Sequence, residues 1–208
     1  ADDCTTPDLA ATTGLYAFDN TLASTGTQGQ SNPGCTSVRN DLWFRWTAPI
    51  SGIAHLDTCG QTSVDTAVAV YDGSGCPAST SIACDDDGCG LQSTTHWLAS
   101  SGATYMLQVG SSGGLSGGWG TFRIEVDPPP ANDDCATPAP AGIGGMTYDN
   151  TAATTGTQGQ STNCGAIHDD LWFTWTASTS GTATIETCFQ TAVNTMIAVY
   201  PGSGCPTA

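Results

Sequence analysis

Residues 41–48 read Asp-Leu-Trp-Phe-Arg-Trp-Thr-Ala, and residues 170–177 read Asp-Leu-Trp-Phe-Thr-Trp-Thr-Ala. A short run rich in aromatic residues is typical of a β-strand. Because this run returns almost unchanged later in the chain, it also indicates an internal repeat.

The repeat extends on both sides of this strand. The further matches are Asp-Asp-Cys at 2–4 and 133–135, Gly-Thr-Gln-Gly-Gln-Ser at 26–31 and 156–161, and Gly-Ser-Gly-Cys-Pro at 73–77 and 202–206. Matches of this length in the same order indicate two copies of one domain.

The matches and the prolines between them set the domain boundaries. We predict a first domain over residues 1–126, a stiff proline-rich linker at 127–131 and a second copy over residues 132–208. The second copy has no counterpart of residues 80–126, so we expect it to be incomplete. Either the natural chain continues past Ala208, or another subunit supplies the absent strands.

Alternation of apolar and polar residues dominates each copy, and helical periodicity is absent. Predicted strands, separated by glycine-rich turns, lie at 42–47, 52–58, 66–71, 94–98, 104–109 and 120–126. Short strands at regular spacing favour a jelly-roll-like antiparallel β-sandwich. The predicted fold class is therefore all-β, with tandem disulfide-stapled sandwiches of which the second is truncated.

The charge balance excludes two classes of partner. The chain has 19 acidic and 3 basic side chains, a formal net charge of −16, and 11% charged residues. Nucleic acid and anionic lipid both attract clustered Lys and Arg, so we expect this chain to bind neither. No apolar run is longer than a strand, and we therefore expect no membrane insertion.

Ten cysteines in a chain of low charge favour an oxidising compartment, in which disulfides persist. The first two cysteines of the first copy both recur in the second, which favours pairing within each couple. The other four in the first copy allow three connectivities. The favoured disulfides are Cys4–Cys35, Cys135–Cys164, Cys76–Cys84 and Cys59–Cys89. Cys188 and Cys205 are left without an expected partner.

One acidic turn is a candidate calcium site. Asp85, Asp86 and Asp87 are consecutive, and a hard cation relieves the repulsion between neighbouring carboxylates. Aligned as an EF-hand loop the segment fails, because Ala83 would be its first ligand and Thr94 would replace the closing glutamate. The alternative is a solvated acidic turn without a cation.

Tryptophan side chains present flat apolar faces that suit sugar stacking or packing between repeats. Trp43 and Trp46 have opposite parity on one strand, so one of them is expected to face outward. We therefore predict a contact surface for glycans or neighbouring repeats. Its residues are Trp43, Trp46, Trp172 and Trp175. The alternative is simple surface or cross-strand pairing.

The sequence offers no catalytic constellation. Two Gly-x-Ser-x-Gly matches, at 110–114 and 114–118, lack the following helix that a nucleophile elbow needs. The histidines at 55, 96 and 168 are scattered, and the first copy has Arg39 where the second has His168. We predict that the chain is not an enzyme.

Six segments of the first copy carry a family resemblance: 41–48, the turn at 51–52, 68–72, 84–88, 105–110 and 120–124. They resemble the bacterial pre-peptidase C-terminal domain family in its cysteine-rich tandem version. The resemblance implies a non-catalytic jelly-roll sandwich exported from the cell.

The same resemblance implies a second calcium site, where an acidic N-terminal segment meets the loop before the aromatic strand. The matching residues are Asp2, Asp3 and Asp41 in the first copy, and Asn132, Asp133, Asp134 and Asp170 in the second. The alternative is that Asp41 and Asp170 end a loop by accepting backbone hydrogen bonds.

Together these features predict an extracellular structural repeat protein that forms a bacterial surface stalk, fibre or filament. Such a protein would assemble head to tail with copies of itself. The alternative is a non-catalytic accessory module of a secreted hydrolase, with a targeting or carbohydrate-binding role.

Overall fold

The computed structural model describes residues 1–30, 35, 37–78, 80–113, 116–160 and 165–206. The chain divides into two compact units, Ala1–Pro128 and Pro129–Ala208, with the boundary inside the proline-rich stretch. The described residues contain strands and no helix, so the predicted all-β class is confirmed. In particular, this part of the chain holds no helix of the length and apolar character needed to cross a bilayer.

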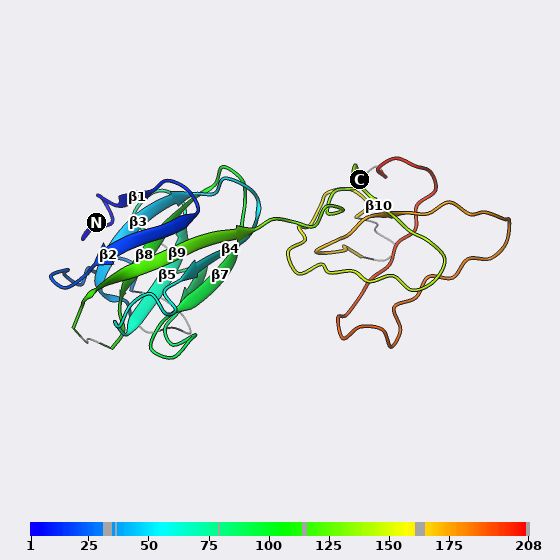
Figure 1. Ribbon diagram of the computed structural model, residues 1–208. Coiled ribbons are helices and arrows are strands. Elements are labelled where there is room, and N and C mark those ends of the chain that lie inside the picture. Colours follow the sequence, from blue (N-terminus) through cyan, green and yellow to red (C-terminus); the bar gives the residue numbers. More distant parts are fainter. Residues whose placement is uncertain (31–34, 36, 79, 114–115, 161–164, 207–208) are drawn as a thin grey trace. The chain divides into compact units, whose positions relative to one another are not determined.

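The first unit is a sandwich of two sheets (Figure 1). The five-stranded sheet has the order β1 (Asp8–Ala10), β3 (Arg39–Thr47), β8 (Thr104–Ser111), β5 (Thr66–Asp72) and β6 (Ala83–Asp85). The four-stranded sheet has the order β2 (Gly14–Asp19), β9 (Trp119–Asp127), β4 (Gly52–Asp57) and β7 (Thr94–Ala99). The six strands predicted from alternation are all present, and β1 pairs with β3 in the parallel direction.

The main hydrophobic core lies between the two sheets. Trp46 on β3, Leu107 on β8 and Phe122 on β9 are each fully or almost fully buried there. More buried and more exposed residues alternate along β4 and β7, because one face of their sheet meets this core and the other face meets solvent.

A second apolar layer covers the opposite face of the five-stranded sheet. Trp43, Tyr71 and Met106 are buried in it together with Cys4. The central strands β5 and β8 are therefore buried on both faces, which explains why they read as continuous apolar runs.

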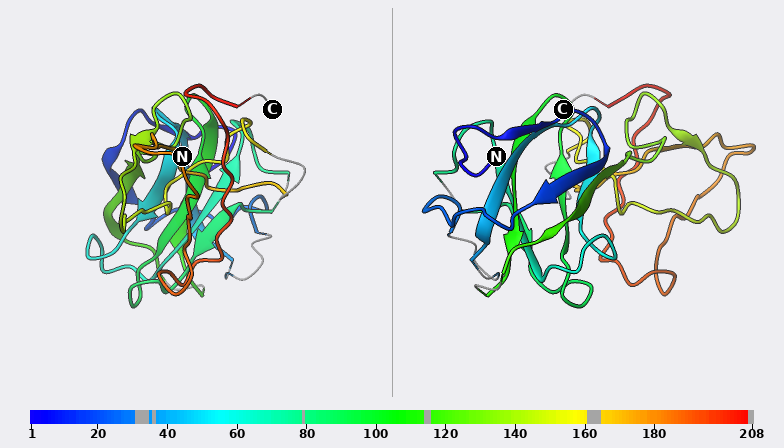
Figure 2. Two further views of the ribbon diagram at one scale, coloured as in Figure 1. Left: turned by 90° about the vertical axis from the view of Figure 1, so that its right-hand side faces the viewer. Right: turned by 60° about the vertical axis from the view of Figure 1, so that its left-hand side comes forward.

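In each sheet of the first unit, one interior strand comes from the C-terminal part of the unit. In the five-stranded sheet β8 lies between β3 and β5, and in the four-stranded sheet β9 lies between β2 and β4. Figure 2 shows the two sheets of this unit from two further directions. Both sheets thus depend on strands that come from the last third of the unit.

The second unit has far less regular structure. Its described strands are β10 (Ala139–Pro140) and β11 (Phe173–Thr174), which pair in parallel with the register of β1 and β3. Figure 1 draws the other described residues of this unit as coil.

Candidate functional site

The outer face of the four-stranded sheet gathers polar side chains from three strands. His55 and Asp57 lie on β4, Arg123 and Glu125 on β9, and Thr94 on β7. The register places His55 opposite Glu125 and Asp57 opposite Arg123. These positions share a face because alternate residues of a strand point to the same side.

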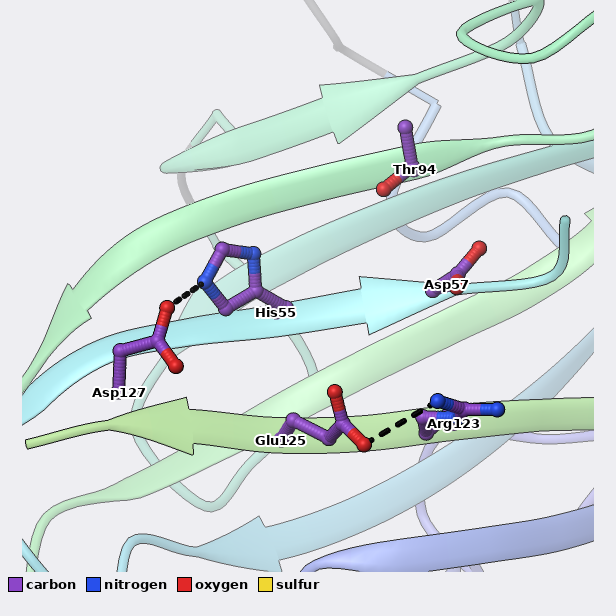
Figure 3. Close-up of a pocket in the computed structure, with 6 residues that line it drawn as sticks. All are labelled: His55, Asp57, Thr94, Arg123, Glu125 and Asp127. Carbon is purple, nitrogen blue, oxygen red and sulfur yellow. Dashed lines mark hydrogen bonds and ion pairs between the residues drawn. The ribbon is translucent and has the colours of Figure 1, made fainter.

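The face is hollowed between these side chains. Figure 3 shows the hollow, of about 190 Å³, with its lining residues His55, Asp57, Thr94, Arg123, Glu125 and Asp127. Enclosed small-molecule pockets usually measure roughly 300–1,000 Å³. The hollow is therefore suited to an open contact with part of a ligand.

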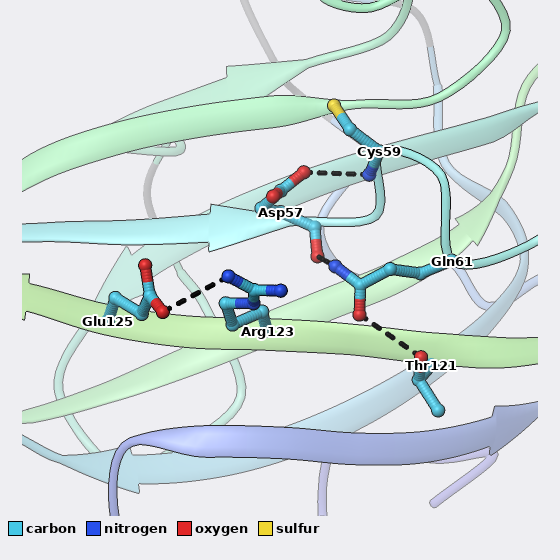
Figure 4. Close-up of polar contacts among 6 residues, drawn as sticks. All are labelled: Asp57, Cys59, Gln61, Thr121, Arg123 and Glu125. Carbon is cyan, nitrogen blue, oxygen red and sulfur yellow. Dashed lines mark hydrogen bonds and ion pairs between the residues drawn. The ribbon is translucent and has the colours of Figure 1, made fainter.

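Hydrogen bonds fix the polar groups at one end of the hollow. The backbone N–H of Cys59 donates to Asp57 Oδ1 over 2.7 Å. Gln61 Nε2 donates to the backbone oxygen of Asp57 over 3.0 Å, and Thr121 Oγ1 donates to Gln61 Oε1 over 3.1 Å. Figure 4 shows how this chain of contacts holds Asp57 beside the strand that carries Arg123.

Two side-chain pairs lie on the same face. Arg123 Nη1 lies 3.2 Å from Glu125 Oε1, and His55 Nε2 lies 3.0 Å from Asp127 Oδ2. The Arg123 side chain is 44% exposed, so solvent screens its pair. Exposed pairs of this kind contribute about 0–1 kcal/mol to stability. Stability therefore does not explain why scarce charged groups gather here.

The scarcity of these groups makes their placement informative. The chain has three basic residues and three histidines, and Arg123, His55 and His96 lie on this one face. The two histidine rings are 6.0 Å apart between centroids. A surface with donors, acceptors and aromatic rings can bind a ligand rich in hydroxyl groups.

Trp119 adds a large aromatic side chain to the face. It begins β9, has the same parity as Arg123 and is 79% exposed. At about 3.3 Å per residue, the Cα atoms of the two residues are roughly 13 Å apart along the strand. We refer to Trp119, Arg123, Glu125, His55, Asp57 and Asp127 as the β9 face.

A group of three carboxylates lies elsewhere in the first unit. Ligand oxygens of Asp65, Asp86 and Asp87 lie within 4.8 Å of one another. Asp85 is not in this group, because its Oδ2 accepts hydrogen bonds from the backbone N–H groups of Gly88 and Thr94. Burial raises the pKa of Asp65, and the charges of Asp87 and Asp86 raise it further.

Residues 1–124 match a protein-family model described as galactose binding domain-like and labelled as associated with T9SS, the type IX secretion system. The chain belongs to this galactose binding domain-like family. The matched description is that of a non-catalytic binding module. The T9SS association and the disulfides point to a secreted or extracellular protein.

Two solved structures are also similar. One is the pre-peptidase C-terminal domain of a collagenase from Bacillus anthracis, with 12% identity, 61% of this chain and 100% of that chain covered, and a TM-score of 0.35. The other is PliG from Aeromonas hydrophila, a periplasmic inhibitor of g-type lysozyme, with 12% identity, 58% and 100% coverage, and a TM-score of 0.33. No curated protein matches the chain significantly.

The structure of the galactose binding domain-like unit contradicts the contact surface that was predicted at the tryptophans. Trp43 and Trp46 do point to opposite faces of β3, but both are almost fully buried. The outward-pointing Trp43 is covered by the second apolar layer, so it is not available to a partner. In the second unit Trp172 is half-buried against Tyr200, and Trp175 is exposed.

The exposed aromatic residue of the first unit's sheet is instead Trp119, which the predicted surface left out. The signal was in the sequence, because Trp119, Thr121, Arg123 and Glu125 alternate with small or apolar residues. That alternation marks a polar outer face on the last strand of this family domain.

The structure also corrects most of the predicted disulfides. Among the described residues the disulfides are Cys4–Cys76, Cys35–Cys84, Cys59–Cys89 and Cys135–Cys205. Of these, the Cys59–Cys89 pair agrees with the prediction, whereas the predicted pairs Cys4–Cys35 and Cys76–Cys84 and the partner predicted for Cys135 are wrong. Cys164 lies outside the described residues. The repeat held the missed signal, because the counterpart of Cys76 is also present in the second copy as Cys205.

In the part of the chain that the structure describes, Asp2, Asp3 and Asp41 do not form a group of carboxylates whose oxygens all lie within 4.8 Å of one another. Asp41 is fully buried, and its carboxylate accepts hydrogen bonds from Gly26, Trp43 and Gln108. Asp2 accepts from Ser24, and Asp3 accepts from Thr5, which lowers the pKa of Asp3. Protein donors thus occupy the carboxylates that the resemblance assigns to calcium.

The second unit repeats this arrangement. Asn132 donates to the backbone oxygen of Trp172, and Asp134 accepts from the N–H of Ala136. The remaining acceptors are Asp133, which receives hydrogen bonds from Thr154, and Asp170, which receives one from Gly156. As in the first unit, these groups end loops and cap turns.

Changing Asp65 to asparagine is expected to raise the melting temperature at neutral pH. The folded state binds the Asp65 proton more tightly than the unfolded chain, so stability falls as the pH rises from 3.8 through the raised pKa. Asn194 stands at the matching position of the second copy. Thermal unfolding of the wild type and Asp65→Asn should differ at pH 7 and converge below pH 3.8. A variant less stable at every pH would contradict this account.

The calcium site expected at residues 85–87 stays a prediction, with Asp65, Asp86 and Asp87 as the carboxylates that are close enough. Calcium should raise the melting temperature of the wild type by binding the folded state. It should have no effect on the Asp86→Asn/Asp87→Asn variant. Equal responses of both proteins, or none in the wild type, would contradict the prediction.

Proposed function

We propose that this chain is a non-catalytic module of a secreted or surface protein, and that its β9 face binds glycans. One observation carries the proposal: an exposed tryptophan and a hollow lined by fixed carboxylates, an arginine and a histidine share one open face. The galactose binding domain-like description of the family supports the same ligand class.

The chemistry of the face suits sugar rings. An indole face packs against the apolar side of a pyranose, while charged groups exchange strong hydrogen bonds with its hydroxyls. Asp57 is held in position by Cys59 and Gln61, so little side-chain freedom is lost on binding. The spacing between Trp119 and Arg123 suits an oligosaccharide that lies along β9.

The test is binding of galactose-containing oligosaccharides to the intact chain, by glycan array and calorimetry. We expect Trp119→Ala and Arg123→Ala each to weaken binding about tenfold, since each lost contact is worth roughly 1–2 kcal/mol. Leu22→Ala is the control, because Leu22 is 96% exposed and lies outside the β9 face.

Two outcomes would contradict glycan binding at this face. The folded wild type would bind none of the arrayed glycans, or both face variants would bind as tightly as Leu22→Ala.

The repeated sequence supports a second proposal, which concerns the larger protein to which this chain belongs. We infer that the chain is one portion of a repeat array, in a stalk, fibre or accessory region related to pre-peptidase C-terminal domains. The near-identical copies and the three consecutive prolines between them support this. A protein with several complete repeats would present several β9 faces, which increases avidity for a glycan surface.

A further inference from the structure

Two of the three histidines in the chain lie directly opposite each other in the four-stranded sheet. The antiparallel register of β4 and β7 pairs His55 with His96, and the centroids of their rings are 6.0 Å apart. Both residues have the parity of the outer face of the sheet, because the residues on either side of each are buried. Nitrogen ligands from two neighbouring strands therefore meet on one open face.

The spacing of the two rings is close to that of two imidazoles bound to one metal ion. Zinc binds histidine nitrogen at about 2.0–2.1 Å with tetrahedral angles, which places the centroids of two bound rings roughly 5 Å apart. His55 and His96 would thus need to approach each other by roughly 1 Å. The side chain of His55 is 37% exposed and His96 is exposed, so rotation about their side-chain bonds can supply this movement.

The contact between His55 and Asp127 leaves one ring nitrogen of His55 ready for a metal. Nε2 of His55 lies 3.0 Å from Asp127 Oδ2. An ionised carboxylate only accepts hydrogen bonds, so Nε2 carries the proton, and in the neutral ring the lone pair lies on Nδ1. Histidines that bind metals commonly have their other nitrogen held by a carboxylate in this way.

The order of the strands places His96 and Asp127 on opposite sides of His55. β4 lies between β9, which carries Asp127, and β7, which carries His96. Figure 3 shows Nδ1 on the side of the His55 ring away from Asp127. Among the described residues, the His55 ring forms one hydrogen bond, the one to Asp127. Nδ1 is therefore available on the side of the strand that carries His96.

The charges around the histidine pair favour a cation. Asp57, Glu125 and Asp127 supply three carboxylates to the hollow on this face, whereas Arg123 supplies one guanidinium, which pairs with Glu125. The chain as a whole has a formal net charge of −16. An acidic surface of this kind raises the local concentration of cations.

The donor atoms select the kind of cation. Imidazole nitrogen suits zinc, copper and nickel, whereas calcium and magnesium prefer oxygen ligands. The histidine pair thus differs in its chemistry from the group of Asp65, Asp86 and Asp87, where calcium is expected.

We propose that His55 and His96 form a surface site for a divalent transition metal ion such as zinc. The two imidazoles bind the ion, and Asp127 is a positioning residue that holds His55 through Nε2. Water fills the other coordination positions of the ion. The site does not depend on glycan binding, because none of its contacts involves a sugar.

The test is titration of the intact chain with zinc, followed by NMR of the imidazole signals. Zinc should shift the signals of His55 and His96, and it should leave those of His168, which lies in the second unit, unchanged. An excess of calcium should not reverse the shifts, because calcium takes oxygen ligands. Zinc is the only ligand added, so the result is independent of the glycan experiment.

Calorimetry with zinc measures what each imidazole contributes. His55→Ala and His96→Ala each remove one of two ligands, and each should weaken zinc binding at least tenfold. His168→Ala is the matched control and should bind zinc as tightly as the wild type. Because the site lies on the exposed face of the sheet, these changes leave the core between the sheets intact.

The positioning role of Asp127 is tested in the same way. Asp127→Ala should weaken zinc binding about tenfold, as is typical when the carboxylate behind a metal-binding histidine is lost. In a His55→Ala background the same change should have a much smaller effect, since the histidine that Asp127 positions is absent. An equal loss in both backgrounds would contradict the positioning role.

Three results would overturn the proposal. The first is a folded wild-type chain whose His55 and His96 signals do not respond to zinc. The second is an equal response of all three histidines, which would indicate unspecific binding. The third is zinc affinity that survives both His55→Ala and His96→Ala but is lost in Asp86→Asn/Asp87→Asn, which would assign the ion to the carboxylate group.

Discussion

Changing Asp41 to alanine should destabilise the first unit by about 3–5 kcal/mol, because the variant leaves buried donors without their charged acceptor. The carboxylate is fully buried and receives the indole N–H of Trp43 over 2.8 Å and Gln108 Nε2 over 3.1 Å. Gln108 also accepts the hydroxyl of Tyr71, so the loss spreads through three strands. Urea unfolding followed by tryptophan fluorescence measures the effect.

The chain supplies matched controls for Asp41. Asp170→Ala removes the equivalent carboxylate in the second unit, where Gly156 is its one donor among the described residues, and should cost about 1 kcal/mol or less. Asp8→Ala removes an exposed carboxylate and should change stability by less than about 0.5 kcal/mol. If Asp41→Ala were no more harmful than these two changes, the buried network would not be a main source of stability.

Removing the Cys4–Cys76 disulfide should lower the stability of the first unit by about 4 kcal/mol. The bond closes a loop with a sequence separation of 72 residues, so its loss greatly increases the freedom of the unfolded chain. Cys4 is also buried beside Trp43 and Tyr71, and alanine at both positions leaves part of that layer unfilled. Chemical denaturation of Cys4→Ala/Cys76→Ala against the wild type measures the loss.

The Cys59→Ala/Cys89→Ala variant is the comparison, since its shorter separation of 30 residues predicts about 3.5 kcal/mol. Cys188→Ser should have no measurable effect, because that thiol is free and exposed. Non-reducing mass mapping decides the connectivity itself. A Cys4–Cys35 fragment would restore the pairing predicted from the sequence and reject the one in the structure.

The same residues explain why the aromatic strand recurs with so little change. Asp41 and Trp43 bond to each other, and Trp43 packs against Gly29, whose φ of 68° suits glycine. A Cβ at Gly29 would lie 2.6 Å from the Trp43 ring. Gly159 has a φ of 67° and the same close approach to Trp172. The described part of the repeated motif at 26–30 and the motif at 41–48 thus form one structural cluster, and so do their counterparts in the second unit.

The strands, the repeat and the all-β class could all be predicted from the amino-acid sequence. Alternation of apolar and polar residues depends only on which side of a strand meets the core, and it is visible without knowing the neighbours. The strands at 52–58 and 94–98 were predictable for this reason. Repeated segments such as 41–48 were visible because the same local contacts are built twice.

The contacts between residues that are distant in the sequence could not be predicted, because they depend on how the strands pack in three dimensions. The partner of Cys4 depends on how the N-terminal segment crosses the five-stranded sheet, which no local pattern records. Trp43 faces away from the main core as its parity requires, yet a second layer buries it. The β9 face likewise needs the order of β4, β7 and β9 in one sheet, because strand order brings together side chains that lie far apart in the sequence.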